Sequence, residues 1–255
     1  MAGSDSGGGA GIQADLKTFQ VLGVFGASAI TAVTAQNTRG VKEIFTLSPA
    51  LVEKQIDAVM EDIAPQAVKV GMLGEASIIE AVARKAKEYA IERLVVDPVM
   101  VASSGAPLLD PAAVGILKSR LLPLALVVTP NLAEAGSLAG FPVSTRQTME
   151  KAARVIREMG PRYVVIKGGH RSRDADDLFF DGREAFFLRS PRFTGKKLHG
   201  TGCTFSAAIT AGLARGLSPR RAITEAKSFM MEVLKNPLKP GHGAYTPNLF
   251  LRDFL

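Results

Sequence analysis

The only cysteine of the chain directly follows two glycines and begins a run of residues that favour a helix. Gly200, Thr201 and Gly202 precede Cys203, and residues 204–212 (TFSAAITAG) have helical propensity. Two glycines allow backbone N–H groups to turn toward one point, and the helix behind them adds free N–H donors and a partial positive charge. Residues 200–203, called the glycine turn below, are therefore predicted to bind an anion.

Cys203 has two interpretations in this position. The field at the start of a helix favours thiolate over thiol, so the side chain could serve as a base. A lone cysteine on a helix is more often buried packing, and this stretch alone leaves both alternatives open. The turn is not a Walker A loop, because Gly-x-x-x-x-Gly-Lys-[Ser/Thr] does not occur in the chain, and it lacks the dinucleotide Gly-x-Gly-x-x-Gly spacing. A phosphate would have to be held in another way.

Short β-branched runs alternate with amphipathic segments, which predicts strand-helix units on a parallel sheet. The strands are nearly continuous apolar runs, as expected when helices cover both faces. Any single turn after a strand could have no role other than to end the strand. Five such turns with polar residues at one edge of the sheet predict a ligand site. The five are TAQNT after ASAITAV, Gly71-Met72 in AVKVGML, Asp97-Pro98 in RLVVDPVM, Thr129-Pro130-Asn131 in ALVVTPN, and KGGH in YVVIKGGH.

Several local signals predict where helices and strands begin and end. Ser48 and Pro49 form an N-cap and first-turn pair before a helix, and Ser144 with Gln147 resembles a capping box. Gly160 supplies the stop of the helix that follows Ser144. Asp181-Gly182 lies between LFF and REAFFL, which predicts one antiparallel hairpin with a two-residue turn.

Composition limits the class of protein. At 255 residues and 47% apolar, the chain can bury one large core, and we expect a single domain over residues 1–255. One cysteine excludes an intramolecular disulfide and a cysteine-rich zinc site, which favours a reducing compartment and hence the cytoplasm. The N-terminus lacks the regions of a signal peptide, and the apolar runs are too short to span a bilayer. The net charge of +7 is scattered, and three Tyr and no Trp offer little stacking, so a polyanionic small molecule is favoured over nucleic acid.

Seven motifs together resemble a known enzyme family, in their order and at their intervals. They are GSDSGGGAGIQADLKTF, TAQNT, VGML, VDPVM, TPNLAEA, KGGH and HGTGCT, and the match runs from Ala2 to about Lys235. The chain resembles the hydroxymethylpyrimidine and hydroxymethylpyrimidine-phosphate kinases of thiamine biosynthesis, which belong to the ribokinase superfamily. The resemblance implies a three-layer αβα sandwich with a mostly parallel central sheet and a small antiparallel hairpin.

The resemblance also implies the reaction. ATP would phosphorylate 4-amino-5-hydroxymethyl-2-methylpyrimidine to its monophosphate and then to the diphosphate, with Mg²⁺ present and a homodimer as the common assembly. Cys203 would be the general base, because many sugar kinases of the superfamily carry Asp at this position and this subgroup resembles those with Cys. Gly200, Thr201 and Gly202 would grip the phosphoryl group with backbone amides, since phosphoryl transfer needs mainly alignment and charge neutralisation.

The substrate contacts that the resemblance implies come from the first part of the chain. The amide of Gln36 can donate one hydrogen bond and accept another, which matches an aminopyrimidine edge. Met72 and Val99 would form an apolar wall beside the ring, although ordinary core packing is the plainer interpretation. Asp15 and the backbone of Gly3 and Ala10 correspond to substrate contacts in the N-terminal loop.

The nucleotide contacts come from the second part of the chain. Asn131 and Glu134 form an Asn-x-x-Glu pair that in the superfamily orients Mg²⁺ and the triphosphate. Asp97 would add a second carboxylate, in keeping with the sparse, water-rich sites that Mg²⁺ prefers. Lys167 lies where a cation would offset phosphate charge, although a lysine that ends a strand is usually just solvated.

The chain also departs from the family pattern. Relatives have an apolar strand before Ala2, so we expect this strand to be missing beside the substrate loop, unless the start was assigned too late or another segment fills the slot. Lys197-Leu198 stand where relatives commonly carry Asn-Thr, and the tail GHGAYTPNLFLRDFL loses the usual Pro and closing His. Two alternatives stay open: a pyridoxal kinase of the same superfamily, against which TAQNT argues, and a non-catalytic pyrimidine sensor.

Overall fold

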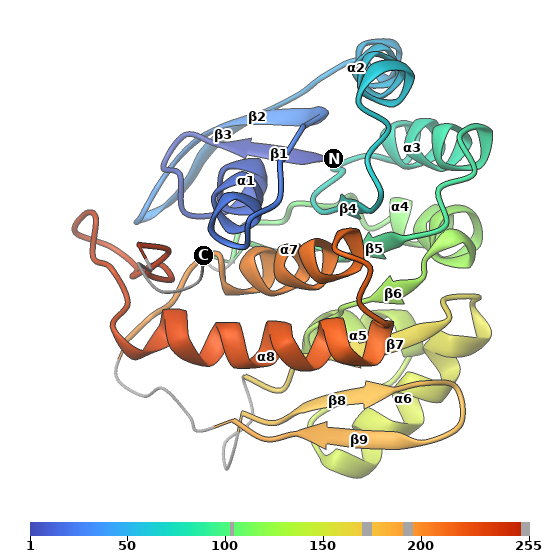
Figure 1. The fold of residues 1–255 in the computed structure, drawn as a ribbon, viewed down its shortest axis with the longest axis vertical. Coiled ribbons are helices and arrows are strands. Elements are labelled where there is room, and N and C mark those ends of the chain that lie inside the picture. The colour runs from blue at the N-terminus through green and yellow to red at the C-terminus, as the bar shows by residue number, and fades with distance from the viewer. Residues whose placement is uncertain (103–104, 170–174, 191–195, 251–255) are drawn as a thin grey trace.

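A computed structural model gives the fold of residues 1–102, 105–169, 175–190 and 196–250. Two groups of strands run through the molecule (Figure 1). The first has the order β1-β2-β3, with β1 (Ala2–Asp5) parallel to β2 (Ile30–Asn37) and β3 (Gly40–Thr46) antiparallel to β2. The second has the order β4 to β9. Its parallel strands are β4 (Val68–Val70), β5 (Leu94–Val96), β6 (Val127–Val128) and β7 (Tyr163–Ile166), and the antiparallel β8 (Asp177–Phe180) and β9 (Ala185–Leu188) form its edge.

Met1 links the two groups of strands. Its amino group donates to the Lys69 carbonyl at 2.8 Å, and its carbonyl accepts from the Gly71 amide at 2.9 Å. The sequence predicted a gap beside the substrate loop, but the structure places β1 there. Ala-Gly-Ser-Asp has weak strand propensity, and pairing with β2 overrides it.

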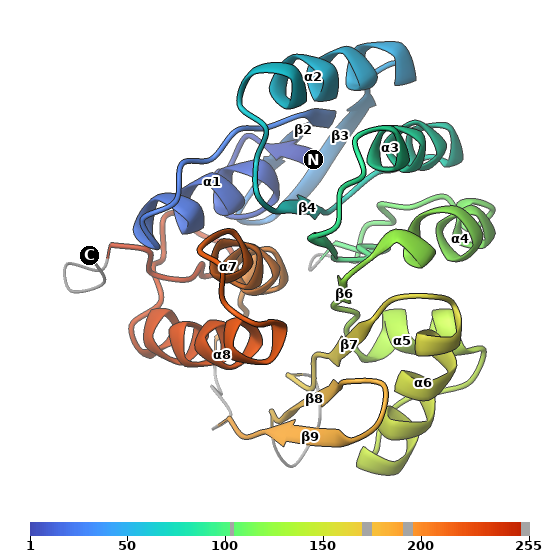
Figure 2. The same ribbon diagram turned by 45° about the vertical axis from the view of Figure 1, so that its right-hand side comes forward.

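Helices cover both faces of the central parallel strands (Figure 2). One layer holds α1 (Gly11–Val21), α7 (Thr201–Ala214) and α8 (Pro219–Lys235). The other holds α2 (Pro49–Asp62), α3 (Ala76–Glu88), α4 (Ala113–Ile116), α5 (Leu132–Ala139) and α6 (Arg146–Glu158). After α4 the chain passes through a π-helical turn (Leu117–Leu121) and a 3₁₀ turn (Leu122–Leu124). The predicted three-layer αβα sandwich is confirmed.

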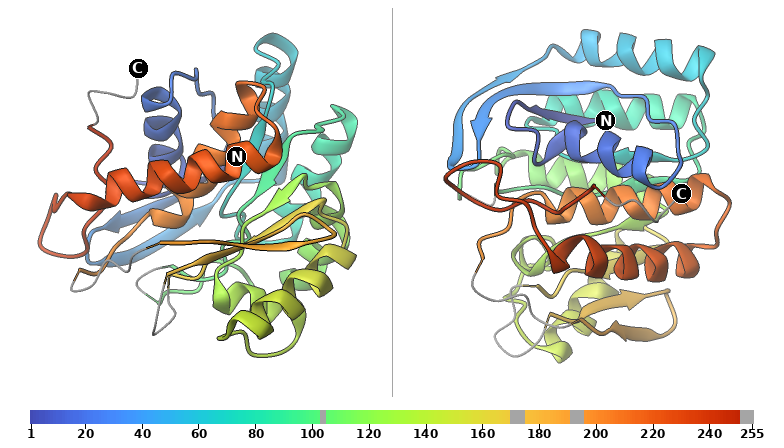
Figure 3. Two further views of the ribbon diagram at one scale, coloured as in Figure 1. Left: turned by 60° about the horizontal axis from the view of Figure 1, so that its bottom comes forward. Right: turned by 60° about the vertical axis from the view of Figure 1, so that its left-hand side comes forward.

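Alternate residues of each central strand enter different cores. Leu94 and Val96 of β5 pack into the core under α2 to α6, whereas Val95 between them packs into the core under α7 and α8. Because side chains of a strand alternate between its faces, a strand covered on both sides must be apolar throughout. This explains the continuous apolar runs of the sequence. Figure 3 shows α7 and α8 side by side on their face of the sheet.

Local signals fixed some element ends and misplaced others. Ser48 Oγ accepts from the Leu51 amide and Pro49 opens α2, as predicted. The capping box of α6 lies one residue later than predicted, because Thr145 and Thr148 exchange the side-chain to backbone bonds at 2.9 and 3.1 Å. A hydroxyl at both positions completes the box without Ser144 or Gln147.

The predicted antiparallel hairpin is present as β8 and β9. The connection has four residues, 181–184, and not the predicted two. Asp181 Oδ1 accepts from the amides of Arg183 and Glu184 and so holds the longer turn. Among the described residues, no helix is both long and apolar enough to cross a membrane.

Candidate active site

A cavity of about 200 Å³ lies where the parallel strands end and α7 begins. The structure brings nearly all of the predicted site residues to its wall. These are Gly3, Ala10, Gln36, Met72, Asp97, Val99, Asn131, Glu134, Lys167, Gly200, Thr201, Gly202 and Cys203. Asp15 is the exception among the predicted residues. The polar turns of the sequence thus meet at one edge of the sheet, although His170 of the KGGH motif lies outside the described residues.

The glycine turn is pressed against the N-terminal loop, residues 6–10. Gly200 is the N-cap of α7 in a left-handed conformation (φ 79°), and a Cβ atom there would lie 1.8 Å from the Gly9 carbonyl oxygen. A Cβ atom on Gly202 would lie 3.1 Å from Lys167 Nζ. Glycine is therefore needed at position 200 for both conformation and space. The first N–H groups of α7 have no partner within the helix and open toward the cavity.

Cys203 lines the cavity as a thiol. Burial, with the nearby carboxylates of Asp15 and Asp97, raises its pKa to about 11, although the Lys69 ammonium and the Gly11 amide lower it. The prediction that the helix terminus favours the thiolate is therefore wrong for the ligand-free protein. Desolvation of the charged form outweighs the partial charge of the helix.

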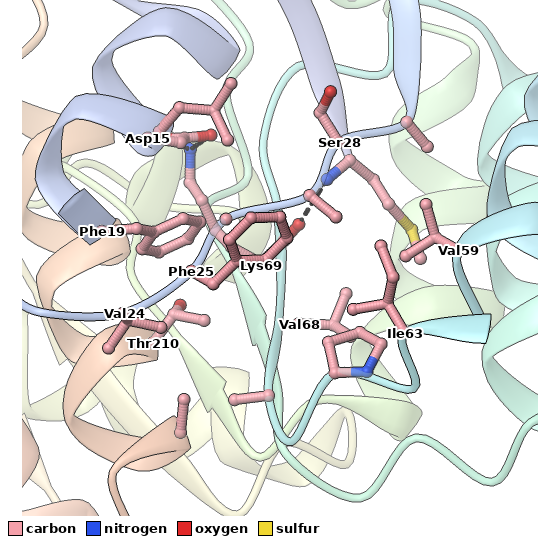
Figure 4. A pocket seen from close by; sticks show the side chains of 18 of the residues that line it. Asp15, Phe19, Val24, Phe25, Ser28, Val59, Ile63, Val68, Lys69 and Thr210 are labelled. Carbon is pink, nitrogen blue, oxygen red and sulfur yellow. Dashed lines mark hydrogen bonds and ion pairs between the residues drawn. The ribbon is translucent and has the colours of Figure 1, made fainter.

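Lys69 occupies the wall where the sequence predicted Asp15. Its Nζ donates to both Asp15 carboxylate oxygens, at 2.7 and 2.8 Å, and both side chains are almost fully buried. Asp15 faces a second, mostly apolar cavity of about 180 Å³ (Figure 4). The predicted contact between Asp15 and substrate is corrected: the carboxylate reaches the larger cavity only through Lys69.

The ion pair keeps the proton on Lys69. Burial raises the pKa of Asp15. Burial alone would lower the pKa of Lys69, but the facing Asp15 carboxylate more than offsets it and the pKa lies above its ordinary value. Sequence reasoning missed Lys69. The signal was a lysine in the middle of the apolar strand VKV, where a charge buried on both faces requires a partner.

The buried Asp97 and the partly buried Lys167 form a second ion pair at the cavity. Asp97 Oδ1 accepts from Lys167 Nζ at 2.7 Å and Oδ2 accepts from Ser206 Oγ at 3.2 Å. Lys167 Nζ also lies 3.9 Å from Glu134 Oε2. Burial alone would lower the pKa of Lys167, but the Asp97 and Glu134 carboxylates raise it overall. A cation held between two carboxylates thus faces the cavity.

The Asn-x-x-Glu pair is a helix cap. Asn131 Oδ1 accepts from the Glu134 amide at 2.9 Å, and Glu134 Oε2 accepts from the Asn131 amide at 2.7 Å. This capping box begins α5 and was not predicted. Burial raises the pKa of Glu134 to about 7, although Lys167 opposes the rise.

The carboxylates fit Mg²⁺ only together with ligands from outside the chain. Asp97 and Glu134 offer the hard oxygen atoms that Mg²⁺ prefers, and both line the cavity. No group of three or more His, Cys, Asp or Glu side chains within the described residues could hold a metal. Water and phosphate oxygens would complete the coordination, as is usual for this ion.

Gln36 is held near His199, and both line the cavity. Its backbone exchanges two hydrogen bonds with Ser6 Oγ, at 2.7 and 2.8 Å. Its amide lies between Thr34 Oγ1 and His199 Nε2, and His199 Nε2 lies 3.2 Å from Asp5 Oδ2. Asp5 and His199 were missed as site residues, because only the folded chain brings the first and last motifs together.

Two apolar side chains, Met72 and Val99, also line the cavity. Met72 is buried, and a Cβ atom on Gly3 would lie 3.0 Å from its sulfur. Gly3 therefore allows the thioether to approach β1.

The divergent C-terminal tail borders the His199 side. The Tyr245 carbonyl accepts from the His199 amide at 2.8 Å, and the Tyr245 amide donates to the Lys197 carbonyl at 2.8 Å. The Gly243 amide donates to Thr38 Oγ1 at 3.1 Å. Residues 251–255 of the tail lie outside the described residues.

The fold is that of a ribokinase-like kinase. A family model described as phosphomethylpyrimidine kinase matches residues 5–248, and the chain belongs to this family. A Bacillus subtilis protein named hydroxymethylpyrimidine/phosphomethylpyrimidine kinase is 50% identical over 252 residues, which cover 98% of this chain and 93% of that protein.

Solved structures of related kinases share the fold of this chain. A Bacillus subtilis pyridoxal kinase in an ADP complex superposes with a TM-score of 0.91 at 39% identity, covering 96% of this chain and 94% of that one. A phosphomethylpyrimidine kinase from Clostridium difficile gives 0.81 at 42% identity, covering 90% and 95%.

Proposed function

We propose that the chain transfers phosphoryl groups from ATP to 4-amino-5-hydroxymethyl-2-methylpyrimidine and then to its monophosphate, in thiamine diphosphate biosynthesis. The observation that carries the proposal is that Gln36, the glycine turn and Lys167 line one and the same cavity. Gln36 can recognise an aminopyrimidine edge. The name of the Bacillus subtilis relative and the ADP complex of the pyridoxal kinase support the substrate and the nucleotide.

The residues near the start of α7 bind the phosphoryl group and neutralise its negative charge. The amides of the glycine turn bind the transferring phosphoryl group, and Lys167 offsets its negative charge. Asp97 and Glu134 hold Mg²⁺ largely through water, and the ion neutralises triphosphate oxygens when bound. Asn131 fixes Glu134 through the capping box, so its part in this site is to orient a carboxylate.

Cys203 accepts the proton of the attacking hydroxyl in the first step. The hydroxymethyl oxygen forms a bond to the γ-phosphorus, the bond to ADP breaks, and the hydroxyl proton passes to the thiolate form of Cys203, which its pKa of about 11 makes the minor form at neutral pH. In the second step the acceptor is a phosphate monoester whose second pKa of about 6 leaves it largely ionised at neutral pH. Only the first step then needs a base.

A coupled assay of ATP consumption tests the proposal with the hydroxymethylpyrimidine, its monophosphate and pyridoxal side by side. We expect turnover of both pyrimidines. Turnover of pyridoxal alone would make the chain a pyridoxal kinase, like the Bacillus subtilis protein whose structure superposes with a TM-score of 0.91. Pyrimidine binding without ATP consumption would make it a sensor.

A cytoplasmic homodimer belongs to the same proposal. The outer face of β2 and β3 carries a cross-strand pair, Val33 and Phe45, that is 46% and 68% exposed. An apolar pair so exposed on a sheet supports a contact with another subunit. Light scattering after size-exclusion chromatography tests this, and a monomeric mass with unchanged turnover would contradict it.

A further inference from the structure

The side-chain amide of Gln36 lies between two hydrogen-bonding neighbours. In the structure its Nε2 is 3.0 Å from His199 Nε2, and its Oε1 is 3.2 Å from Thr34 Oγ1. An amide can turn by 180° and exchange these two atoms with almost no change of shape, so the protons of the neighbours decide which end is oxygen.

Asp5 fixes the proton of His199. Its carboxylate accepts from the amides of Gly7 at 2.8 Å, Gly9 at 3.0 Å and Ala10 at 2.8 Å. Burial alone would raise the pKa of Asp5, but the contact with His199 and the backbone amides lower it overall, so the group is ionised. An ionised carboxylate only accepts. His199 Nε2, 3.2 Å from Asp5 Oδ2, must therefore carry a proton.

A protonated Nε2 cannot accept a hydrogen bond from Gln36. Both the neutral ring protonated at Nε2 and the imidazolium present a donor at this atom. The amide atom that faces His199 must therefore be the oxygen.

Thr34 leads independently to the same orientation. Its hydroxyl has one hydrogen, and it lies 2.9 Å from the Ser4 carbonyl oxygen, which can only accept. That contact is shorter than the 3.2 Å contact to Gln36. With its hydrogen directed to Ser4, the Thr34 hydroxyl accepts from Gln36, so the amide atom that faces it must be the nitrogen.

We infer that His199 and Thr34 together lock the Gln36 amide with its oxygen toward His199 and its nitrogen toward Thr34, and that this lock determines which edge of a heterocyclic substrate the cavity accepts. His199, held by Asp5, and Thr34, held by Ser4, are positioning residues. The lock is a property of the ligand-free chain. Its consequence for the substrate rests on the proposed function.

The locked amide sets the direction of an aminopyrimidine. The free lone pair of Oε1 accepts from the 4-amino group on the His199 side, and the free N–H of Nε2 donates to ring nitrogen N3 on the Thr34 side. The 5-hydroxymethyl group is attached next to the amino group and away from N3, so it points beyond His199 toward the glycine turn that follows it. With the amide reversed, the ring would turn over and carry the hydroxyl away from α7.

Nitrogen-15 NMR of the ligand-free protein tests the lock. The chain has three histidines, and the His199 signals are assigned by their loss in His199→Gln. We expect the Nε2 resonance of His199 to be that of a protonated, pyrrole-like nitrogen. An unprotonated, pyridine-like Nε2 would overturn the inference, whatever the protein phosphorylates.

Kinetics test the consequence with two substrates. One is the aminopyrimidine, and the other is its 4-oxo analogue, 5-hydroxymethyl-2-methylpyrimidin-4-one, which offers an acceptor at C4 and a donor at N3. We expect the wild-type chain to favour the amino compound by at least roughly a hundredfold in kcat/KM, because the locked amide leaves both groups of the analogue unpaired.

Matched variants separate the lock from mere packing. His199→Leu and Thr34→Val remove the polar atoms at similar volume, whereas His199→Gln and Thr34→Ser retain a donor and a hydroxyl. In His199→Leu/Thr34→Val the amide can turn, so the preference should fall at least tenfold, mainly through KM for the pyrimidine, while KM for ATP stays within about twofold. The His199→Gln/Thr34→Ser variant should keep most of the preference for the amino compound. An unchanged preference in the Leu/Val variant would overturn the inference. If the wild-type chain phosphorylates neither compound, the proposed function fails and the NMR result still decides the lock.

Discussion

Replacing Glu134 separates two roles that the structure gives this side chain. Glu134 Oε2 accepts from the Asn131 amide at the start of α5, and its carboxylate is one of the buried charges around Lys167. Glutamine also serves in a capping box, so Glu134→Gln keeps the cap and removes the charge. Glu134→Ala removes both, and comparison of the two variants isolates each role.

The magnitude follows from the raised pKa. Burial lifts the pKa of Glu134 from 4.5 to about 7, so ionisation of this group opposes folding. The protonated Glu134 side chain therefore stabilises the folded state fully below pH 4.5, and this stabilisation is lost as the pH rises through about 7. A pKa shift of this size lowers the free energy of unfolding at alkaline pH by roughly 3 kcal/mol relative to acidic pH. At pH 8, Glu134→Gln should therefore be more stable than wild type by up to that amount relative to their difference at pH 5.

Urea unfolding at pH 5 and pH 8 measures this double difference, since groups that do not interact with Glu134 titrate alike in both proteins. At pH 5 Glu134→Ala should lie about 0.5–2 kcal/mol below Glu134→Gln, which is the usual contribution of an N-terminal cap. If the difference in free energy of unfolding between wild type and Glu134→Gln were equal at both pH values, the raised pKa of Glu134 would be refuted. Equal stability of the Gln and Ala variants at pH 5 would show that the cap contributes nothing.

Three further predictions concern the groups around the cavity. Cys203→Ala should reduce phosphorylation of the alcohol far more than that of the monophosphate, measured separately; equal losses would remove Cys203 as the base. Because its pKa is about 11, kcat/KM for the alcohol should rise with pH above 7 while that for the monophosphate stays nearly level, and parallel profiles would contradict this. Lys69→Met leaves Asp15 buried without a partner and should lower the free energy of unfolding by about 3–5 kcal/mol, whereas Lys69→Met/Asp15→Asn should recover most of it. Failure of the double variant to recover would show that packing, not charge, explains the loss.

The sequence was sufficient to locate the site because several of its predicted strands are followed by turns that carry polar residues. Apolar runs such as VKVG and VVDP must lie in a covered sheet, and parallel strands place their carboxyl ends at one edge. Asp97, Asn131 and Lys167 could be assigned to that edge without coordinates. The resemblance of the motifs then supplied the family.

The direction and charge of individual side chains could not be obtained in this way. Asp15 lies on a helix whose rotation about its axis decides which cavity it faces, and Lys69 takes its place. The pKa of Cys203 is a sum over burial and over charges contributed by α1, β4 and the end of β5. Such sums require distances between segments that are far apart in the sequence.

The contact between Gly200 and the carbonyl of Gly9 makes the two ends of the chain interdependent. A methyl group at position 200 would displace the loop whose amides hold Asp5, and the disturbance would reach the heterocycle-binding end before it reached the phosphate. An absolute requirement for glycine at this position in a mutational scan would therefore be imposed by main-chain crowding between two loops, and not by nucleotide recognition.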